Sequence, residues 1–356
     1  MLSVFAGENA LQHIRKNGLS PADIRCVMGA SGAAKWLAIA GLDKAIFGHW
    51  LNTSPQHITL YGTSVGAFKL AAAAHADPVT ALDRLARAYI EQQYRGATDA
   101  DAIAEQMEPV IQAVAGYGAV EQVLSHATLR LQFGAVRCLD EKLASGDIRD
   151  QQQVMARAFG ANLRSRQRLQ SFVQRTTFSD VRLPHGYSAV ESKGSSWVAL
   201  TAENYRAALI ASGSLPVYMH AVVDIPGAPT GVYRDGGLLD YHPIPSSEAG
   251  DGSEKLILYP HFYPRLTEGW FDKFLPWRKV STAALTNVVL LCPSKRFIAS
   301  LEGGKIPDRH DFLKFQGRDA TRMQRWNSAV AQSDELGEQF LQWVCSGRIA
   351  DEVKPL

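Results

Sequence analysis

The chain has 356 residues, of which 46% are hydrophobic and 20% are charged, and its formal net charge is +2. This composition is ordinary for a globular protein with a hydrophobic core. A net charge so close to zero produces no overall field toward nucleic acid or a strongly acidic partner, so we expect no nucleic-acid binding. No run reaches the roughly 18 to 20 apolar residues that a membrane-spanning helix needs.

The N-terminus and the cysteines favour a cytoplasmic location. Residues 1–18 do not combine a basic start with a long apolar stretch, so they do not resemble a signal peptide. The four cysteines have no paired spacing, which favours free thiols over disulfides or a zinc site. They are Cys26, Cys138, Cys292 and Cys345. No His, Asp and Glu cluster has metal-ligand spacing, and we expect neither a metal nor a cofactor.

The first part of the chain repeats a strand, a tight turn and a helix. An apolar run at 23–28 leads into a glycine-rich turn, and a helical pattern follows over 33–50. A second apolar run at 57–61 leads into the sequence GTSVG and an alanine-rich helix over about 65–78. This alternation predicts an α/β fold, with a mostly parallel sheet covered by helices.

The middle of the chain has a different character. Residues 79–175 are rich in Gln, Arg and Ala and poor in β-branched runs, which predicts a helical insertion. Its last part, 151–175, carries Arg157, Arg164, Arg166, Arg168 and Arg175. This pattern favours the solvated face of a surface helix. Contact with anionic head groups or phosphate is the alternative.

Strand-like segments return in the second half of the chain, and a helix closes it. The strands are expected at 195–201, 216–224, 231–235, 254–260 and 287–293, and the C-terminal helix at about 319–345. No internal repeat or low-complexity linker interrupts the chain. We therefore expect a single domain over residues 1–356, with the helical insertion inside it.

The motif Gly62-Thr63-Ser64-Val65-Gly66 lies between a predicted strand and a predicted helix. A serine nucleophile must stand up from a tight, strained turn, and small flanking residues make room for that turn. The helix that follows directs its N-terminal amides toward a developing anion. Ser64 is therefore a candidate nucleophile, and a purely structural turn is the alternative.

Two other glycine-containing turns could complete such a site. The turn that begins at Gly29 and ends at Lys35 offers unpaired backbone N–H groups, which would form an oxyanion hole if they lay beside Ser64. The turn matches neither GxGxxG nor GxxxxGK[ST], which argues against a phosphate-loop NTPase. Asp235 ends the strand at 231–235, and Gly236-Gly237 after it leaves its carboxylate unobstructed. Such a sequence alone is usually a surface turn, but after a serine turn it is a candidate base.

The order of these three motifs resembles that of the patatin-like phospholipases. Residues 201–222 and 235–244 also resemble segments of that family. The similarity covers about 22–78 and 195–293, is weak over 79–194, and is absent near the C-terminus. It implies a three-layer α/β/α fold and a cofactor-free hydrolase that cleaves acyl esters of lipids or small molecules through a Ser-Asp dyad.

Carried over by position, the resemblance makes Ser64 the nucleophile and Asp235 its base. The amides of Gly32 and Ala33 would form the oxyanion hole, with Lys35 beside them. The supporting glycines would be Gly29, Gly62, Gly66, Gly236 and Gly237. Two departures are clear, because Ser31-Gly32-Ala33 replaces three consecutive glycines, and Trp36 replaces a further glycine. A backbone N–H survives either change.

Three alternatives remain open. A Ser-Asp-His triad would use His242, His261 or His310, but Ser64 follows only the second predicted strand, which favours the dyad. The chain could also transfer the acyl group to an alcohol other than water. It could instead be a catalytically silent protein that binds lipid or another partner, a reading supported only by the altered glycine turn.

Residues 269–279 mix aromatic and basic side chains. Rings that bury in lipid beside cations that meet phosphates suit a membrane surface, and ordinary core packing is the alternative. The aromatic residues Trp270, Phe271, Phe274 and Trp277 are therefore candidates for peripheral membrane contact by an otherwise cytoplasmic protein. In that case the insertion could serve as a lid.

Overall fold

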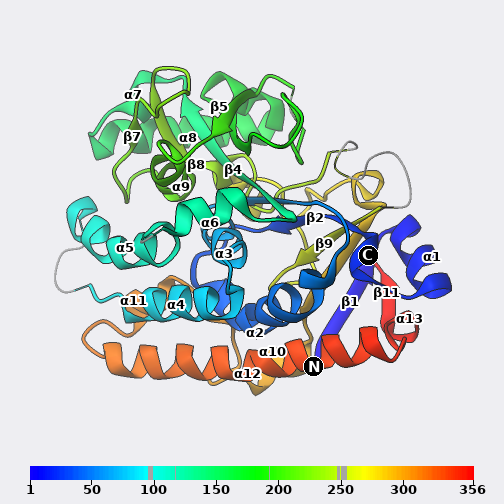
Figure 1. Cartoon of the computed structure of the whole chain (residues 1–356). Helices are drawn as coiled ribbons and strands as arrows, with labels where there is room; N and C mark the ends of the chain where they lie inside the picture. Colours follow the sequence, from blue (N-terminus) through cyan, green and yellow to red (C-terminus); the bar gives the residue numbers. More distant parts are fainter. Residues whose placement is uncertain (95–98, 117, 192, 247–248, 250–254) are drawn as a thin grey trace.

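The fold is built on a central mixed sheet (Figure 1). The computed structural model describes residues 1–94, 99–116, 118–191, 193–246, 249 and 255–356. In that part of the chain the main strand order is β11-β1-β10-β9-β2-β3-β4-β5-β6, and β8 pairs with both β4 and β7. The strands are β1 (Leu2–Ala6), β2 (Ile24–Gly29), β3 (Ile58–Thr63), β4 (Leu129–Cys138), β5 (Val173–Asp180), β6 (Ser196–Leu200), β7 (Val222–Val223), β8 (Val232–Asp235), β9 (Leu256–Pro260), β10 (Val288–Pro293) and β11 (Val353–Pro355).

The middle of the sheet is parallel. β10, β9, β2, β3 and β4 pair in parallel with their neighbours, whereas β1 with β10, β5 with β4, and β8 with β4 pair antiparallel. In an open α/β sheet, ligands bind beyond the carboxyl ends of the parallel strands. The turns after β2 and β3 both lie at such an end, so this edge is where a site is expected.

Helices lie on both faces of this sheet (Figure 1). The α-helices are α1 (Glu8–Asn17), α2 (Ala40–Ala45), α3 (Val65–Ala73), α4 (Pro78–Glu91), α5 (Ala100–Ala115), α6 (Ala119–Ser125), α7 (Glu141–Ala144), α8 (Ile148–Arg164), α9 (Tyr205–Gly213), α10 (Lys295–Ser300), α11 (His310–Lys314), α12 (Asp319–Cys345) and α13 (Ile349–Glu352). On one face α3 packs on β3 and against α4, and α2, α4 and the long α12 pack against one another.

The opposite face of β4 has its own apolar cluster. Val136 of β4 packs there with Val154 and Ala158 of α8, and with Phe271 of the short helix η8 (Trp270–Phe274). Its neighbour Ala135 belongs to the main core, as expected because successive side chains of a strand point to opposite faces. The predicted α/β fold, a mostly parallel sheet between helical layers, is confirmed.

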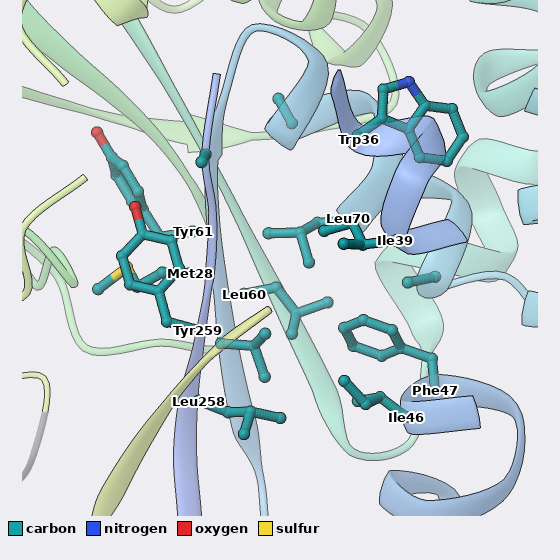
Figure 2. Close-up of a cluster of buried hydrophobic side chains, with 14 of the residues drawn as sticks. Met28, Trp36, Ile39, Ile46, Phe47, Leu60, Tyr61, Leu70, Leu258 and Tyr259 are labelled. Atoms are coloured by element: carbon teal, nitrogen blue, oxygen red, sulfur yellow. The ribbon is translucent and has the colours of Figure 1, made fainter. Parts of the chain in front are cut away.

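The same alternation organises the main core (Figure 2). Leu60 points toward the helices and packs with Ile39 and Leu70, whereas the next residue, Tyr61, points to the other face together with Tyr259. Both Leu60 and Tyr61 are fully buried. Burial on both faces explains why β2 and β3 are mostly apolar and do not alternate between polar and apolar residues.

The segment 79–175 is more than the helical insertion that its composition predicts. It holds α4 to α8, but it also contributes β4 and the start of β5. The sequence of β4, LRLQFGAVRC, is poor in β-branched residues, so its local preference does not indicate a strand. Its pairing with β3, β5 and β8 buries eight of its ten residues and overrides that preference.

Other expected elements differ in detail. The helical stretch over 33–50 is irregular, with the 3₁₀ helix η2 (Ala33–Ile39), then α2, then the π-helical turn η3 (Ile46–Trp50). Within 216–224 only β7 is a strand. β1 and α1 have no predicted counterpart. The other predicted strands are present, and α12 spans the predicted C-terminal helix.

Candidate active site

Ser64 occupies a strained turn between β3 and α3. Its φ of 52° and ψ of −134° lie outside the regions that residues with side chains usually adopt. Its backbone N–H donates to the carbonyl of Ser212 on α9, over 2.9 Å. Non-glycine residues in such conformations persist only where their surroundings enforce them, and they cluster at functional sites.

Asp235 is the last residue of β8, and the pairing of β3 and β8 with the same strand, β4, places it beside Ser64. Thr63 pairs with Gly134 on β4, and the next residue of β4, Ala135, pairs with Asp235. One strand therefore aligns two segments that are 171 residues apart in the sequence. Ser64 Oγ donates to Asp235 Oδ2 over 2.9 Å.

The Asp235 carboxylate is almost completely buried, and its other oxygen accepts from the backbone N–H of Gly237 over 2.7 Å. Burial raises its pKa from 3.8 to about 6, although the hydrogen bonds from Gly237 and Ser64 and the charges of Lys273 and Arg309 oppose this rise. A carboxylate with a pKa near 6 is a better base than an ordinary aspartate, and it remains ionised at neutral pH.

The glycine-rich turn after β2 lies beside this pair. Ser31 ties the turn to β3, because its hydroxyl lies 2.9 Å from that of Thr63. Ala33 has a φ of 52°, a second strained position. In the part of the chain that the structure describes, the backbone N–H groups of Gly32 and Ala33 donate to no protein acceptor, and both residues line the cavity that holds Ser64.

The supporting glycines allow close approach of backbones. A Cβ on Gly66 would lie 2.1 Å from the carbonyl oxygen of Gly29, and one on Gly62 would lie 2.5 Å from the carbonyl carbon of Gly66. A Cβ on Gly236 would lie 2.2 Å from the Gly134 carbonyl oxygen. At Gly237 it would meet Ser31 Oγ at 2.7 Å. These glycines hold β2, α3 and the turn after β8 against one another.

The cavity over Ser64 has a volume of about 320 Å³. Lys35 lines it as expected, and its Nζ donates to the Tyr241 hydroxyl over 3.3 Å. Lys273 and Arg309 line it as well, although neither was predicted as a site residue. Lys273 stands in the aromatic and basic segment 269–279, whereas Arg309 has no local pattern that would reveal it.

The candidate histidines do not complete a triad. His242 is buried, and its Nδ1 accepts from the Thr267 backbone N–H over 2.8 Å. His261 is also buried, and its Nδ1 lies 2.6 Å from the Tyr263 carbonyl oxygen. Burial lowers the pKa of both rings. His310 lines the cavity, but its side chain is 76% exposed and pairs with Asp308.

Among the described residues, therefore, no histidine hydrogen-bonds to Ser64 or Asp235. The two Asp235 oxygens are already engaged by Ser64 and Gly237. This arrangement favours direct proton transfer between the serine and the aspartate over a histidine relay.

Residues 269–279 divide between surface and core. Phe274 and Trp277 are 58% and 69% exposed, whereas Phe271 is buried and Trp270 lines the cavity. Phe271 is therefore unavailable for membrane contact in this structure, because it packs into the cluster around Val136.

The basic segment 151–175 is only in part a solvated face. Arg157 is exposed, but Arg175 is bidentate to Asp240 over 2.6 and 2.7 Å, and Arg166 pairs with Glu268 and Asp272. Arg166 and Arg175 therefore form ion pairs within the fold and are not available to bind phosphate.

Within the described ranges, no helix is both long and apolar enough to cross a membrane. The same residues include no group of three or more His, Cys, Asp or Glu side chains arranged to hold a metal ion.

No family model and no curated protein sequence matches the chain. Among solved structures it is similar to human GIVD cytosolic phospholipase A2, with 11% identity and a TM-score of 0.35, over 96% of this chain and 63% of that one. It is also similar to VipD from Legionella pneumophila, with 12% identity and a TM-score of 0.35, over 89% of this chain and 67% of that one. The chain thus spans about two thirds of the length of either protein.

Proposed function

We propose that this protein is a serine acyl hydrolase of the patatin-like type, which cleaves carboxylic esters of lipids or small molecules. The observation that carries this proposal is the 2.9 Å hydrogen bond from Ser64 Oγ to Asp235, at a strained turn that opens into a cavity. A half-buried serine and a buried aspartate could pair for structural reasons alone. However, unpartnered amides beside them and a cavity above them suit catalysis better.

In the proposed mechanism Asp235 accepts the Ser64 proton as Oγ attacks the ester carbonyl. The carbonyl oxygen becomes an anion, which the N–H groups of Gly32 and Ala33 stabilise. The tetrahedral intermediate then expels the alcohol, which takes the proton from Asp235 and leaves an acyl-Ser64 ester. Water then attacks this ester while Asp235 takes a proton from it. The second tetrahedral intermediate releases the carboxylic acid and expels Ser64 Oγ, which takes the proton back from Asp235.

Ser64→Ala should abolish both ester hydrolysis and covalent labelling by a fluorophosphonate without unfolding the protein. The reason is that Oγ is the atom that bonds to carbon or phosphorus in both reactions. The measurements are turnover of a chain-length series of p-nitrophenyl esters and of a phospholipid panel, and the mass of the labelled protein. Full activity in this variant would rule the proposal out.

Two further results separate the alternatives. A His310→Gln variant that is still labelled and still active excludes His310 as the base. Wild-type protein that binds lipid but resists labelling would indicate a catalytically silent protein. Acyl transfer would appear as a new ester when a competing alcohol is added.

The pH dependence reports on the base. For a neutral ester, kcat/KM should rise with pH and level off above about pH 6, because Asp235 must be ionised to accept the proton and burial raises its pKa to about 6. The groups that face it are Ser64, the Gly237 amide, Lys273 and Arg309. The measurement is a pH profile of p-nitrophenyl acetate hydrolysis, corrected for the uncatalysed rate. An inflection near pH 4 would contradict the assignment.

Peripheral membrane contact through Phe274 and Trp277, together with Trp270 at the cavity, remains part of the proposal. The two exposed rings lie in the same segment as Lys273, whose Nζ stands 4.5 Å from the Trp270 ring centroid. This segment thus links an apolar surface to the mouth of the cavity, as hydrolysis at a lipid surface would require.

A further inference from the structure

Three cationic side chains converge on the cavity that holds Ser64. They come from three separate elements: Lys35 from η2, Lys273 from η8, and Arg309 from the turn before α11. Among the described residues, none of the three forms an ion pair with a carboxylate. Arg166 and Arg175, by contrast, are both paired.

The three charges are close enough to repel one another. The pKa of Lys273 is lowered to about 7, first by desolvation and then by the charges of Arg309 and Lys35, whereas Asp235 opposes the shift. Desolvation also lowers the pKa of Lys35; the charge of Arg309 adds to this effect and Asp308 opposes it. Like charges held together without counterions destabilise a fold unless something compensates them.

The two acidic residues that line the cavity, Asp235 and Asp308, compensate the three positive charges only in part. Asp235 is engaged by Ser64 and Gly237. Asp308 also lines the cavity, but its two carboxylate oxygens each lie 3.3 Å from another residue, Oδ2 from Lys305 Nζ and Oδ1 from His310 Nδ1. The cavity therefore keeps an excess of positive charge next to the nucleophile.

Aromatic rings hold these cations in place. Lys273 Nζ lies 4.5 Å from the ring centroids of both Tyr241 and Trp270, and the Arg309 guanidinium lies 5.5 Å from the ring centroid of Tyr218. A ring face positions a cation without occupying its N–H donors as a carboxylate would. Those donors remain able to bind an anionic group in the cavity.

We infer that Lys35, Lys273 and Arg309 form a subsite for an anionic group of the substrate, so that the preferred esters carry a phosphate or carboxylate close to the scissile carbonyl. This inference rests on the proposed hydrolase function and narrows its substrate class. A volume of about 320 Å³ lies at the small end of ligand pockets, which run from about 300 to 1,000 Å³. The cavity therefore suits a small anionic ester.

The first test compares esters that differ only in one charged group. One pair is 4-acetoxybenzoate and its methyl ester, and the other is 1-butyrylglycerol 3-phosphate and 1-butyrylglycerol. The wild type should show a kcat/KM about tenfold or more higher for the anionic member of at least one pair, as charge-assisted hydrogen bonds would provide. The pair with the larger ratio identifies carboxylate or phosphate as the group.

Lys273→Met and Arg309→Met should each reduce this ratio about tenfold, because each removes one charge from the subsite. The matched control is Lys295→Met, which removes an exposed cation on α10 outside the cavity and should leave the ratio unchanged. A falling limb near pH 7 should also appear with the anionic ester alone, as Lys273 loses its proton, and should be absent in Lys273→Met.

A second test does not depend on turnover. Ser64→Ala protein should bind sn-glycerol 3-phosphate at millimolar concentration in calorimetry, and Arg309→Met in the same background should weaken that binding about tenfold. Wild-type ratios at or below one in both pairs, with Ser64 still labelled by fluorophosphonate, would overturn the subsite while the hydrolase proposal stands. Conversely, if wild-type Ser64 resisted labelling while Ser64→Ala protein still bound glycerol phosphate, the hydrolase proposal would fail and the anion subsite would stand.

Discussion

Asp235→Asn is expected to lower kcat/KM for ester hydrolysis by about 10³- to 10⁴-fold and, at pH 8, to make the protein more stable. The amide cannot accept the Ser64 proton, which explains the loss of activity. Its oxygen can still accept from the Gly237 N–H, and its NH₂ can donate to Ser64 Oγ, so both hydrogen bonds are retained in an uncharged form.

The gain in stability follows from the raised pKa. The folded protein holds a proton on Asp235 up to about pH 6, whereas an unfolded chain releases it near 3.8. Stability is therefore lost as the pH rises from about 4 to 6, and above that range the buried charge costs about 3 kcal/mol. Asn avoids this cost, so its advantage in the free energy of unfolding should be largest above pH 6 and vanish below about pH 4.

Urea unfolding of wild type and variant at several pH values measures this difference. Asp351→Asn, which changes an exposed carboxylate on α13, is the control and should alter neither activity nor stability. If Asp235→Asn were destabilising at pH 8 and retained activity, Asp235 would be a structural residue. That result would remove the base from the proposed mechanism.

The local motifs were predictable because each is a short stretch with a single physical demand. A serine flanked by glycines between a strand and a helix predicts a strained turn, and an aspartate before two glycines predicts an accessible carboxylate. Ser64 and Asp235 could therefore be named from the sequence, although the sequence does not record that β4 aligns them.

The features that the sequence did not reveal depend on contacts between distant segments. β4 is poor in β-branched residues and is stabilised by its neighbours on both sides. Arg309 lies in a turn with no recognisable pattern, and only the fold brings it to the cavity with Lys35 and Lys273. Phe271 resembles its exposed neighbours in sequence, and its burial follows from the packing of η8 on α8.

Gly66→Ala is expected to destabilise the protein by about 3 kcal/mol or more and to displace Ser64. The added Cβ would lie 2.1 Å from the carbonyl oxygen of Gly29 and 2.4 Å from its carbonyl carbon. Both are backbone atoms, so no side chain can move aside to relieve the clash. α3 would have to separate from β2, and this movement would change the turn that presents the nucleophile.

The measurements are thermal and urea unfolding, with fluorophosphonate labelling as the readout for the position of Ser64. Gly160→Ala is the matched control, because the same methyl on α8 meets no atom within 4 Å. There it should stabilise the helix by about 0.5 to 1 kcal/mol through the lower entropy of the unfolded chain. If Gly66→Ala unfolded at the same urea concentration as wild type, β2 and α3 would not be in close contact. That contact places the glycine-rich turn beside Ser64, so the oxyanion hole assigned to Gly32 and Ala33 would lose its structural basis.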